Sequence, residues 1–98
     1  MAEKRSHKAT ANRIALRFGT QYEGGEGVDI NTPWATIEVE SPKTVADAPT
    51  QLQGHRGPAY IAGTNKEAVE KALDVTEGTT IGVMDNQGNI VKPSTRRV

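Results

Sequence analysis

The runs Gly27–Ile30 (GVDI) and Ala35–Glu40 (ATIEVE) alternate apolar and acidic residues, and the segment between them, Asn31–Trp34 (NTPW), has the composition of a turn. Because successive side chains of a strand point to opposite faces, each run has an apolar face and an acidic one. The two runs therefore predict an antiparallel hairpin with three opposed pairs, which are Ile30 with Ile37, Val28 with Val39 and Asp29 with Glu38.

One face of this hairpin gathers three carboxylates, those of Asp29, Glu38 and Glu40. Opposed Cβ atoms of paired strands lie about 4.5–5.5 Å apart, and like charges placed there are destabilising. A divalent cation bound by carboxylate oxygens would compensate the charges. The alternative is a half-buried hairpin whose acidic face is solvated.

The chain has 98 residues, no cysteine and a formal net charge of zero. This length indicates one domain with a modest core, and a homodimer is an expected means of burying more surface. The lack of cysteine excludes disulfides, zinc–thiolate sites and cysteine nucleophiles. No stretch can span a membrane and the start lacks the apolar core of a signal peptide, so we expect a cytoplasmic protein with no membrane partner.

The charges are unevenly distributed along the chain. Residues 1–17 hold five basic residues and one acid, and the tail from Lys92 holds three basic residues and no acid. The centre holds the other eleven acids with four basic residues. Basic ends around an acidic centre suit a polyanion held near a metal site. Charged, mobile termini are the alternative explanation.

The spacing of apolar residues predicts three helices. The first spans 8–18, with Ser6 as its N-cap and Gly19 at its end. The second spans 44–54, where Pro49 either kinks the helix or marks a late start in its first turn. The third follows the N-cap Asn65 and ends before Gly78. Strands are expected at 20–26, which is weak, and at 27–30, 35–40, 58–63, 79–84 and 90–91.

The expected order is α-β-β-β-α-β-α-β-(β). Hairpins combined with crossover helices predict an α/β fold, a single small domain with a mixed central sheet flanked by helices. We expect this domain to span residues 8–92, between a flexible N-terminus (1–7) and a flexible C-terminal tail (93–98).

This arrangement resembles the restriction-endonuclease-like PD-(D/E)XK nuclease superfamily, and within it the small Holliday-junction-resolvase-type and phage nucleases. The resemblance covers most of residues 8–63. The superfamily's strand-end acid falls on Asp29, its (D/E)-x-K element on Glu38-Val39-Glu40 and its helical Gln on Gln51. The chain departs from the pattern at Val28, where proline is usual, and at Glu40, where lysine is usual.

The resemblance implies a site for Mg²⁺ (or Mn²⁺) held by Asp29, Glu38 and the carbonyl of Val39. Glu40 would orient or deprotonate a water, and Lys43 would replace the missing lysine in stabilising the transition state. Four basic residues would contact the phosphate backbone without reading its sequence, namely Lys8, Arg13, Arg17 and Arg56.

These observations predict a metal-dependent nuclease that acts on DNA. Glu40, the neutral net charge and the small size favour a different class, a non-catalytic nucleic-acid- or protein-binding module that keeps a degenerate nuclease fold. A plain α/β domain unrelated to nucleases is a third possibility. Trp34 at the turn is a core or dimer contact, or a nucleic-acid contact, and His7 falls in the expected loose N-terminus and receives no role.

Overall fold

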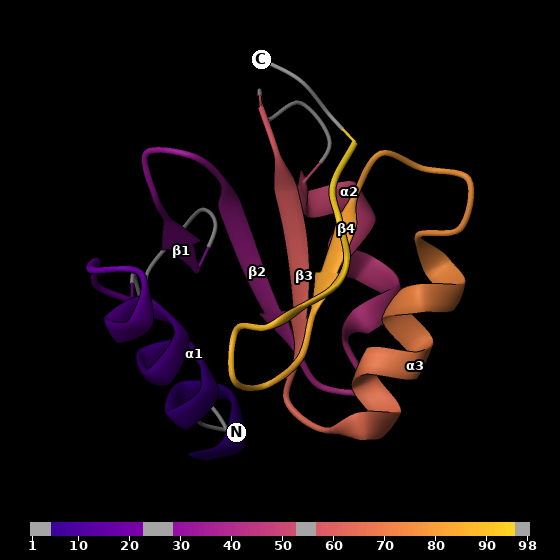
Figure 1. Cartoon of the computed structure of the whole chain (residues 1–98). Coiled ribbons are helices and arrows are strands. Elements are labelled where there is room, and N and C mark those ends of the chain that lie inside the picture. The colour runs from indigo at the N-terminus through magenta and orange to yellow at the C-terminus, as the bar shows by residue number, and fades with distance from the viewer. Residues whose placement is uncertain (1–4, 23–28, 53–56, 96–98) are drawn as a thin grey trace.

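A computed structural model of the chain describes residues 5–22, 29–52 and 57–95. Its elements are α1 (Arg5–Arg17), β1 (Ile30–Asn31), β2 (Thr36–Glu40), the 3₁₀ helix η1 (Val45–Asp47), α2 (Ala48–Leu52), β3 (Ala59–Gly63), α3 (Lys66–Val75), β4 (Gly82–Met84) and β5 (Ile90–Lys92). The five strands form one sheet in the order β1-β2-β3-β4-β5. The predicted α/β domain with a mixed sheet and flanking helices is therefore confirmed (Figure 1).

The sheet combines two hairpins with two parallel crossovers. In the first hairpin Ile30 lies opposite Ile37, as the alternation of apolar residues predicts. Strands β2, β3 and β4 are mutually parallel, because the helical segments η1–α2 and α3 each return the chain to the starting edge. Strand β5 then runs back along β4, with an irregularity in its register beside Val83 and Met84.

Two apolar layers cover the sheet, with α1 on one face and η1, α2 and α3 on the other (Figure 1). Alternation along the strands sends neighbouring residues to opposite layers. The layer on the α1 side contains Ala11, Ile14, Ala15, Ile30, Ala35, Ile37, Val39, Tyr60, Ala62 and Met84. The layer on the other side contains Val45, Ala48, Leu52, Ala59, Ile61, Ala68, Ala72, Ile81 and Val83.

Helix α1 starts earlier than predicted. It begins at Arg5 instead of Lys8, so Ser6 lies inside the helix and the prediction of Ser6 as its N-cap is wrong. Its end is as predicted, because Gly19 has a φ of +72°. The Gly19 and Thr20 N–H groups donate to the carbonyls of Leu16 and Ala15 at 3.1 and 2.9 Å, which forms a Schellman motif.

The starts of the other two α-helices agree with the predictions from the sequence. Helix α2 starts late, at Ala48, and has Pro49 in its first turn. The N-cap of α3 is Asn65, whose side-chain oxygen accepts from the Ala68 N–H at 2.9 Å. No helix among residues 5–22, 29–52 and 57–95 is long and apolar enough to cross a membrane.

Part of the predicted meander falls outside the residues that the structure describes. Of the weak strand expected at 20–26, Tyr22 forms an isolated bridge to Ile30. The rest of that strand from residue 23, and Val28 with its expected pairing to Val39, lie outside the described ranges.

Gly63 ends β3 where α3 turns back onto the sheet. A Cβ atom there would lie 2.6 Å from the Val69 backbone nitrogen and 2.7 Å from Val69 Cγ2. We therefore expect Gly63→Ala to lower the free energy of unfolding by about 1–3 kcal/mol, the usual cost of overpacking, in urea denaturation followed by circular dichroism. Exposed Lys66→Ala is the control and should change stability by less than about 0.5 kcal/mol. Similar losses in both variants would contradict the close approach of strand and helix.

Candidate functional site

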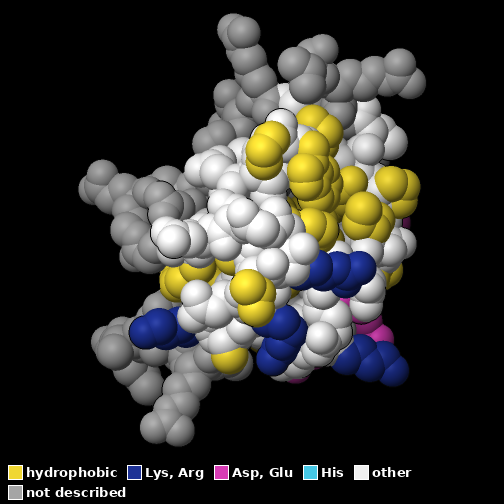
Figure 2. Space-filling view, turned by 60° about the vertical axis from the view of Figure 1, so that its left-hand side comes forward, with side chains coloured by type: hydrophobic (Ala, Val, Ile, Leu, Met, Phe, Trp, Pro, Cys, Tyr) yellow, Lys and Arg dark blue, Asp and Glu magenta, His cyan; other side chains and the backbone are white. Residues whose placement is uncertain are grey.

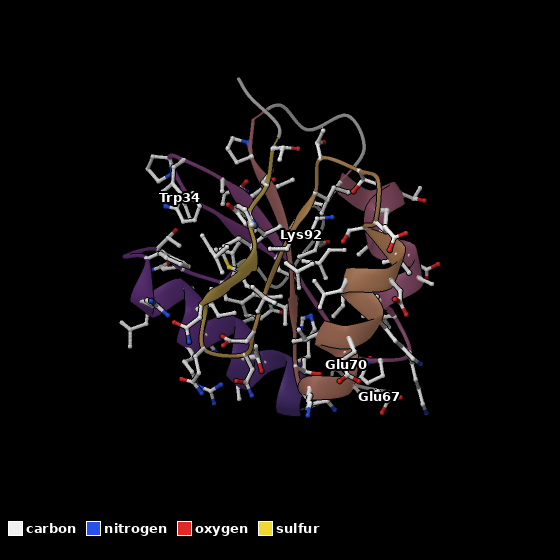
Figure 3. The ribbon with its side chains drawn as sticks, turned by 45° about the vertical axis from the view of Figure 1, so that its right-hand side comes forward. Trp34, Glu67, Glu70 and Lys92 are labelled. Atoms are coloured by element: carbon white, nitrogen blue, oxygen red, sulfur yellow. The ribbon has the colours of Figure 1, made fainter. Side chains whose placement is uncertain are left out.

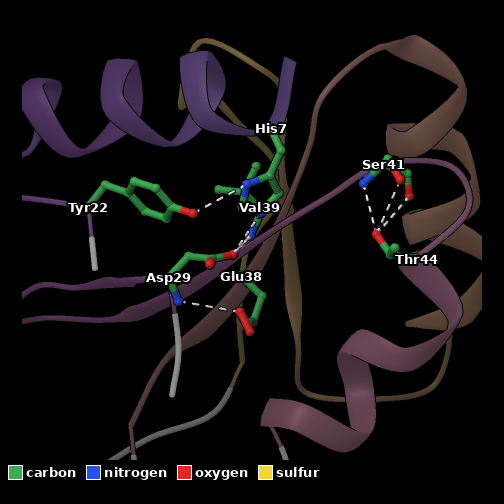
Figure 4. A network of polar contacts seen from close by, with 7 residues as sticks. All are labelled: His7, Tyr22, Asp29, Glu38, Val39, Ser41 and Thr44. Atoms are coloured by element: carbon green, nitrogen blue, oxygen red, sulfur yellow. Dashed lines mark hydrogen bonds and ion pairs between the residues drawn. The ribbon is translucent and has the colours of Figure 1, made fainter. Parts of the chain in front are cut away.

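Asp29 and Glu38 lie side by side at the edge of the sheet. The Asp29 backbone N–H donates to Glu38 Oε2 at 3.4 Å, and the Val39 backbone N–H donates to Asp29 Oδ2 at 2.8 Å (Figure 4). Each carboxylate is thus bonded to the backbone of the opposite segment. The structure therefore brings the predicted pair together, next to the Ile30–Ile37 register that positions it.

The acidic face of β2 is buried. Glu38 is 4% exposed and Glu40 is 6% exposed, so the alternative of a solvated acidic face is wrong. The physical reason is the parallel crossover: β3 places Ile61 beside Glu38 and Gly63 beside Glu40, on the face that η1, α2 and α3 cover. A buried carboxylate is costly unless it is hydrogen-bonded, paired or protonated.

Desolvation and mutual repulsion change the acidity of this cluster. Burial, together with the negative charges of Asp29 and Glu40, raises the pKa of Glu38 from its ordinary value of 4.5 to about 8. Burial also raises the pKa of Glu40, although a hydrogen bond with Thr44 opposes this. At neutral pH Glu38 therefore keeps its proton, and this proton removes the repulsion between Glu38 and its two acidic neighbours. A bound cation would relieve the same repulsion.

His7 is a member of the site that the sequence did not reveal. Its Nε2 lies 3.3 Å from Asp29 Oδ2, and its Nδ1 lies 3.5 Å from the Tyr22 hydroxyl (Figure 4). The His7 and Tyr22 rings pack edge to face, with centroids 5.8 Å apart. The available signal was helical spacing, because His7 continues the stripe of Ala11 and Ile14 one turn back toward the N-terminus.

The remaining predicted catalytic residues are not gathered with the pair. Lys43 is exposed in the turn after β2 and lines a surface hollow with Lys71 and Asp74 of α3. Within the described part of the chain no ion pair joins Lys43 to the carboxylates. Gln51 belongs to α2, but its side chain lies outside the description, as does all of Arg56.

Two of the predicted nucleic-acid contacts hold the protein's own backbone. Arg13 Nη1 donates to the Asn86 carbonyl at 2.8 Å. Arg17 Nη1 donates to the Gln87 carbonyl at 2.8 Å and to Asn89 Oδ1 at 2.7 Å. The two guanidinium groups thereby fasten the β4–β5 turn to α1. Lys8, on the same helix, is exposed.

The adjacent acids Asp29 and Glu38 are the expected ligands for a cation. Among the described residues no group of three or more His, Cys, Asp or Glu side chains is placed to hold a metal ion. Mg²⁺ commonly takes only one or two carboxylates and completes its shell with water and substrate phosphates. A Mg²⁺ site of that kind at Asp29 and Glu38 stays a prediction. Val39 takes part through its N–H, and the role of its carbonyl as a ligand stays a prediction.

Comparisons of the chain with protein-family models, with curated proteins and with solved structures give no match. The resemblance to PD-(D/E)XK nucleases therefore stays a prediction that rests on the residues and their arrangement.

The raised pKa of Glu38 predicts a pH-dependent stability. A group with a folded pKa of about 8 and an ordinary value of 4.5 stabilises the fold fully below pH 4.5, and this contribution is lost as pH rises toward 8. The free energy of unfolding should fall by up to about 1.4 kcal/mol per pH unit across that window. Glu38→Gln should flatten this slope in urea denaturation without divalent cations, whereas exposed Glu67→Gln should retain it. An unchanged slope in Glu38→Gln would show that the carboxyl is not desolvated.

Proposed function

We propose that the protein is a metal-dependent nuclease that cleaves phosphodiester bonds in DNA at the Asp29–Glu38 pair. The supporting observation is that Glu38, 4% exposed, lies against a second carboxylate and has a pKa of about 8. Ionised together, the two groups repel each other in a poorly solvated place. A divalent cation relieves this repulsion while both carboxylates stay ionised.

In this proposal Asp29 and Glu38 hold Mg²⁺ or Mn²⁺ through their side-chain oxygens. The bound cation would supply charge neutralisation and a more acidic water. Glu38 must lose its proton before its carboxylate can act as a ligand, so affinity for the cation should increase with pH. His7 holds the orientation of Asp29 through the contact at 3.3 Å.

Glu40 is the proposed general base. Burial raises its pKa from the ordinary value, which makes its carboxylate a better proton acceptor near neutral pH. The hydrogen bond with Thr44 orients it. Lys43 and Gln51 keep their proposed auxiliary roles, and Lys8, Arg13, Arg17 and Arg56 supply positive charge toward the phosphate backbone. Cytoplasmic localisation and a homodimeric assembly also remain proposals.

A second candidate is a non-catalytic binding module with the same fold. The observation that favours it is that protein groups already satisfy Asp29, whose Oδ2 accepts from the Val39 N–H and lies 3.3 Å from His7. In this alternative the cluster fastens α1 to the first hairpin, and Glu38 stays protonated.

Cleavage of labelled DNA with Mg²⁺ or Mn²⁺ tests the catalytic proposal. Asp29→Asn should lower the rate roughly 100-fold or more, because several kcal/mol of transition-state stabilisation would be lost with the cation. Asp74→Asn, which changes an exposed acid on α3, is the matched control and should cleave like the unchanged protein. Equal cleavage by Asp29→Asn and the unchanged protein would identify a contaminating nuclease.

Amide NMR spectra separate the two candidates directly. Titration with Mg²⁺ should shift the amide signals of Asp29, Glu38 and Val39, and the shifts should require less Mg²⁺ at pH 8 than at pH 6. No shift at millimolar Mg²⁺ would overturn the metal site and leave the binding module as the better account.

A further inference from the structure

Trp34 combines a fixed position with partial exposure to solvent. It is the only tryptophan of the chain, and it is 41% exposed in the β1–β2 turn. Its ring packs edge to face on the rings of Phe18 and Tyr60. The ring centroids lie 5.1 and 5.9 Å away, and the interplanar angles are 78° and 69°. Tyr60 is 5% exposed, so the three rings are anchored in the α1-side core. Figure 3 shows Trp34 at the margin of the molecule.

The turn that carries the indole is itself held by hydrogen bonds. Thr32 Oγ1 accepts from the Trp34 N–H at 3.2 Å and from the Ala35 N–H at 2.8 Å. The Thr32 N–H donates to the Ala35 carbonyl at 2.9 Å. Little conformational entropy would therefore be lost when a flat ligand stacks on the ring, which is the advantage of a preorganised site.

The helix beside this ring carries positive charge without acids. Between Arg5 and Arg17, α1 contains no Asp or Glu. Arg13 and Arg17 are bound by neutral carbonyl and amide oxygens, and Arg17 also interacts electrostatically with the nearby carboxylate of Asp85. Asp85, near Arg17, has its carboxylate bonded to the Gln87 and Asn89 N–H groups at 2.8 and 2.9 Å. Figure 2 shows Lys and Arg side chains across this face, below a band of hydrophobic ones, and the acids of the described residues that it shows lie near one margin.

Phe18 lies between the positive charge of Arg17 and the indole ring of Trp34. It follows directly after α1, contacts Trp34 on one side, and has the Arg17 Cζ atom 5.8 Å from its ring centroid. An aromatic face next to a row of cations is the arrangement that binds single-stranded nucleic acid, in which bases stack on the ring and phosphates meet the charges.

We infer that Trp34 and the exposed side of α1 form a docking surface for single-stranded nucleic acid. An unpaired base stacks on the indole, and the neighbouring phosphates approach Arg17, Arg13 and Lys8. In duplex DNA the bases are stacked on one another, so no base has a free face on which the indole could stack. The inference rests on the proposed function for the choice of nucleic acid as partner, and it narrows the substrate to strands with unpaired bases.

A second copy of the chain is the competing occupant of the exposed ring. Charge disfavours it, because a twofold contact on this face would bring two acid-free α1 helices together. A polyanion has the opposite charge and gains from the same arrangement.

The intrinsic fluorescence of Trp34 tests the inference, since no other tryptophan contributes. With EDTA present to prevent cleavage, unlabelled oligo(dT) should quench the emission saturably, and a duplex should bind more weakly with little quenching. For a labelled oligo(dT) followed by anisotropy, Trp34→Ala should weaken binding roughly 5- to 150-fold, the equivalent of about 1–3 kcal/mol for one stacked base.

Two matched variants guard against a folding artefact. Trp34→Phe keeps an aromatic face and should retain most of the affinity. Val91→Ala removes an apolar side chain of similar exposure, 47%, from the edge strand β5 and should bind like the unchanged protein. Circular dichroism must show that all variants are folded at the assay temperature.

Three outcomes would overturn the inference. The first is unchanged affinity in folded Trp34→Ala. The second is equal affinity and quenching for duplex and single strand. The third is an emission change that follows protein concentration alone, with a doubled mass in light scattering, which would assign the surface to a second copy. Trp34-dependent binding without any metal-dependent cleavage would refute the nuclease proposal alone, and cleavage with unchanged affinity in Trp34→Ala would refute the docking surface alone.

Discussion

The Val39 N–H donates to the Asp29 carboxylate at 2.8 Å, and the edge of the sheet is organised around this hydrogen bond. It secures the segment before β1 to β2 where the short strand itself offers little pairing. It also aims the carboxylate at α1, where His7 meets the same oxygen. One acid thus connects the first hairpin to the helix that covers it, and the Ile30–Ile37 register places a second acid, Glu38, against the Asp29 backbone.

Ionisation of Glu38 is unfavourable at its position in the fold. A carboxyl that is 4% exposed and has Asp29 beside it retains its proton to a pH near 8. Structural acids on strands ordinarily avoid this cost by facing water. Strongly shifted carboxyls gather at functional sites, although structural clusters shift as well. The burial of Glu38 and Glu40 is therefore the main physical argument for a site on β2, and the protonation of Glu38 is the main argument for a purely structural cluster.

The arginines of α1 connect the fold and the proposed function. Bonded to the oxygens of the β4–β5 turn, Arg13 and Arg17 bring together segments from the two ends of the chain. Neutral oxygen acceptors hold the guanidinium groups in place, and Asp85 is a nearby acid that balances part of the Arg17 charge. A protein with a net charge of zero thereby keeps a positive face beside an exposed aromatic ring.

Local signals in the sequence were enough to predict much of this fold. The alternation around Asn31–Trp34 determined the opposition of Ile30 and Ile37. Gly19 and Asn65 marked helix ends correctly, because capping depends on groups within a few residues. The pairing of Asp29 with Glu38 followed from the same hairpin periodicity.

The surroundings of these residues were decided only by the tertiary structure. The alternating pattern shows that Glu38 and Glu40 share a face, but not whether that face meets water. The crossover through η1 and α2 buries it. The contacts of His7 with Asp29, and of Arg17 with Gln87, join segments distant in the chain. Burial and long-range pairing depend on how whole layers pack, and a pattern of neighbouring residues carries no record of that packing.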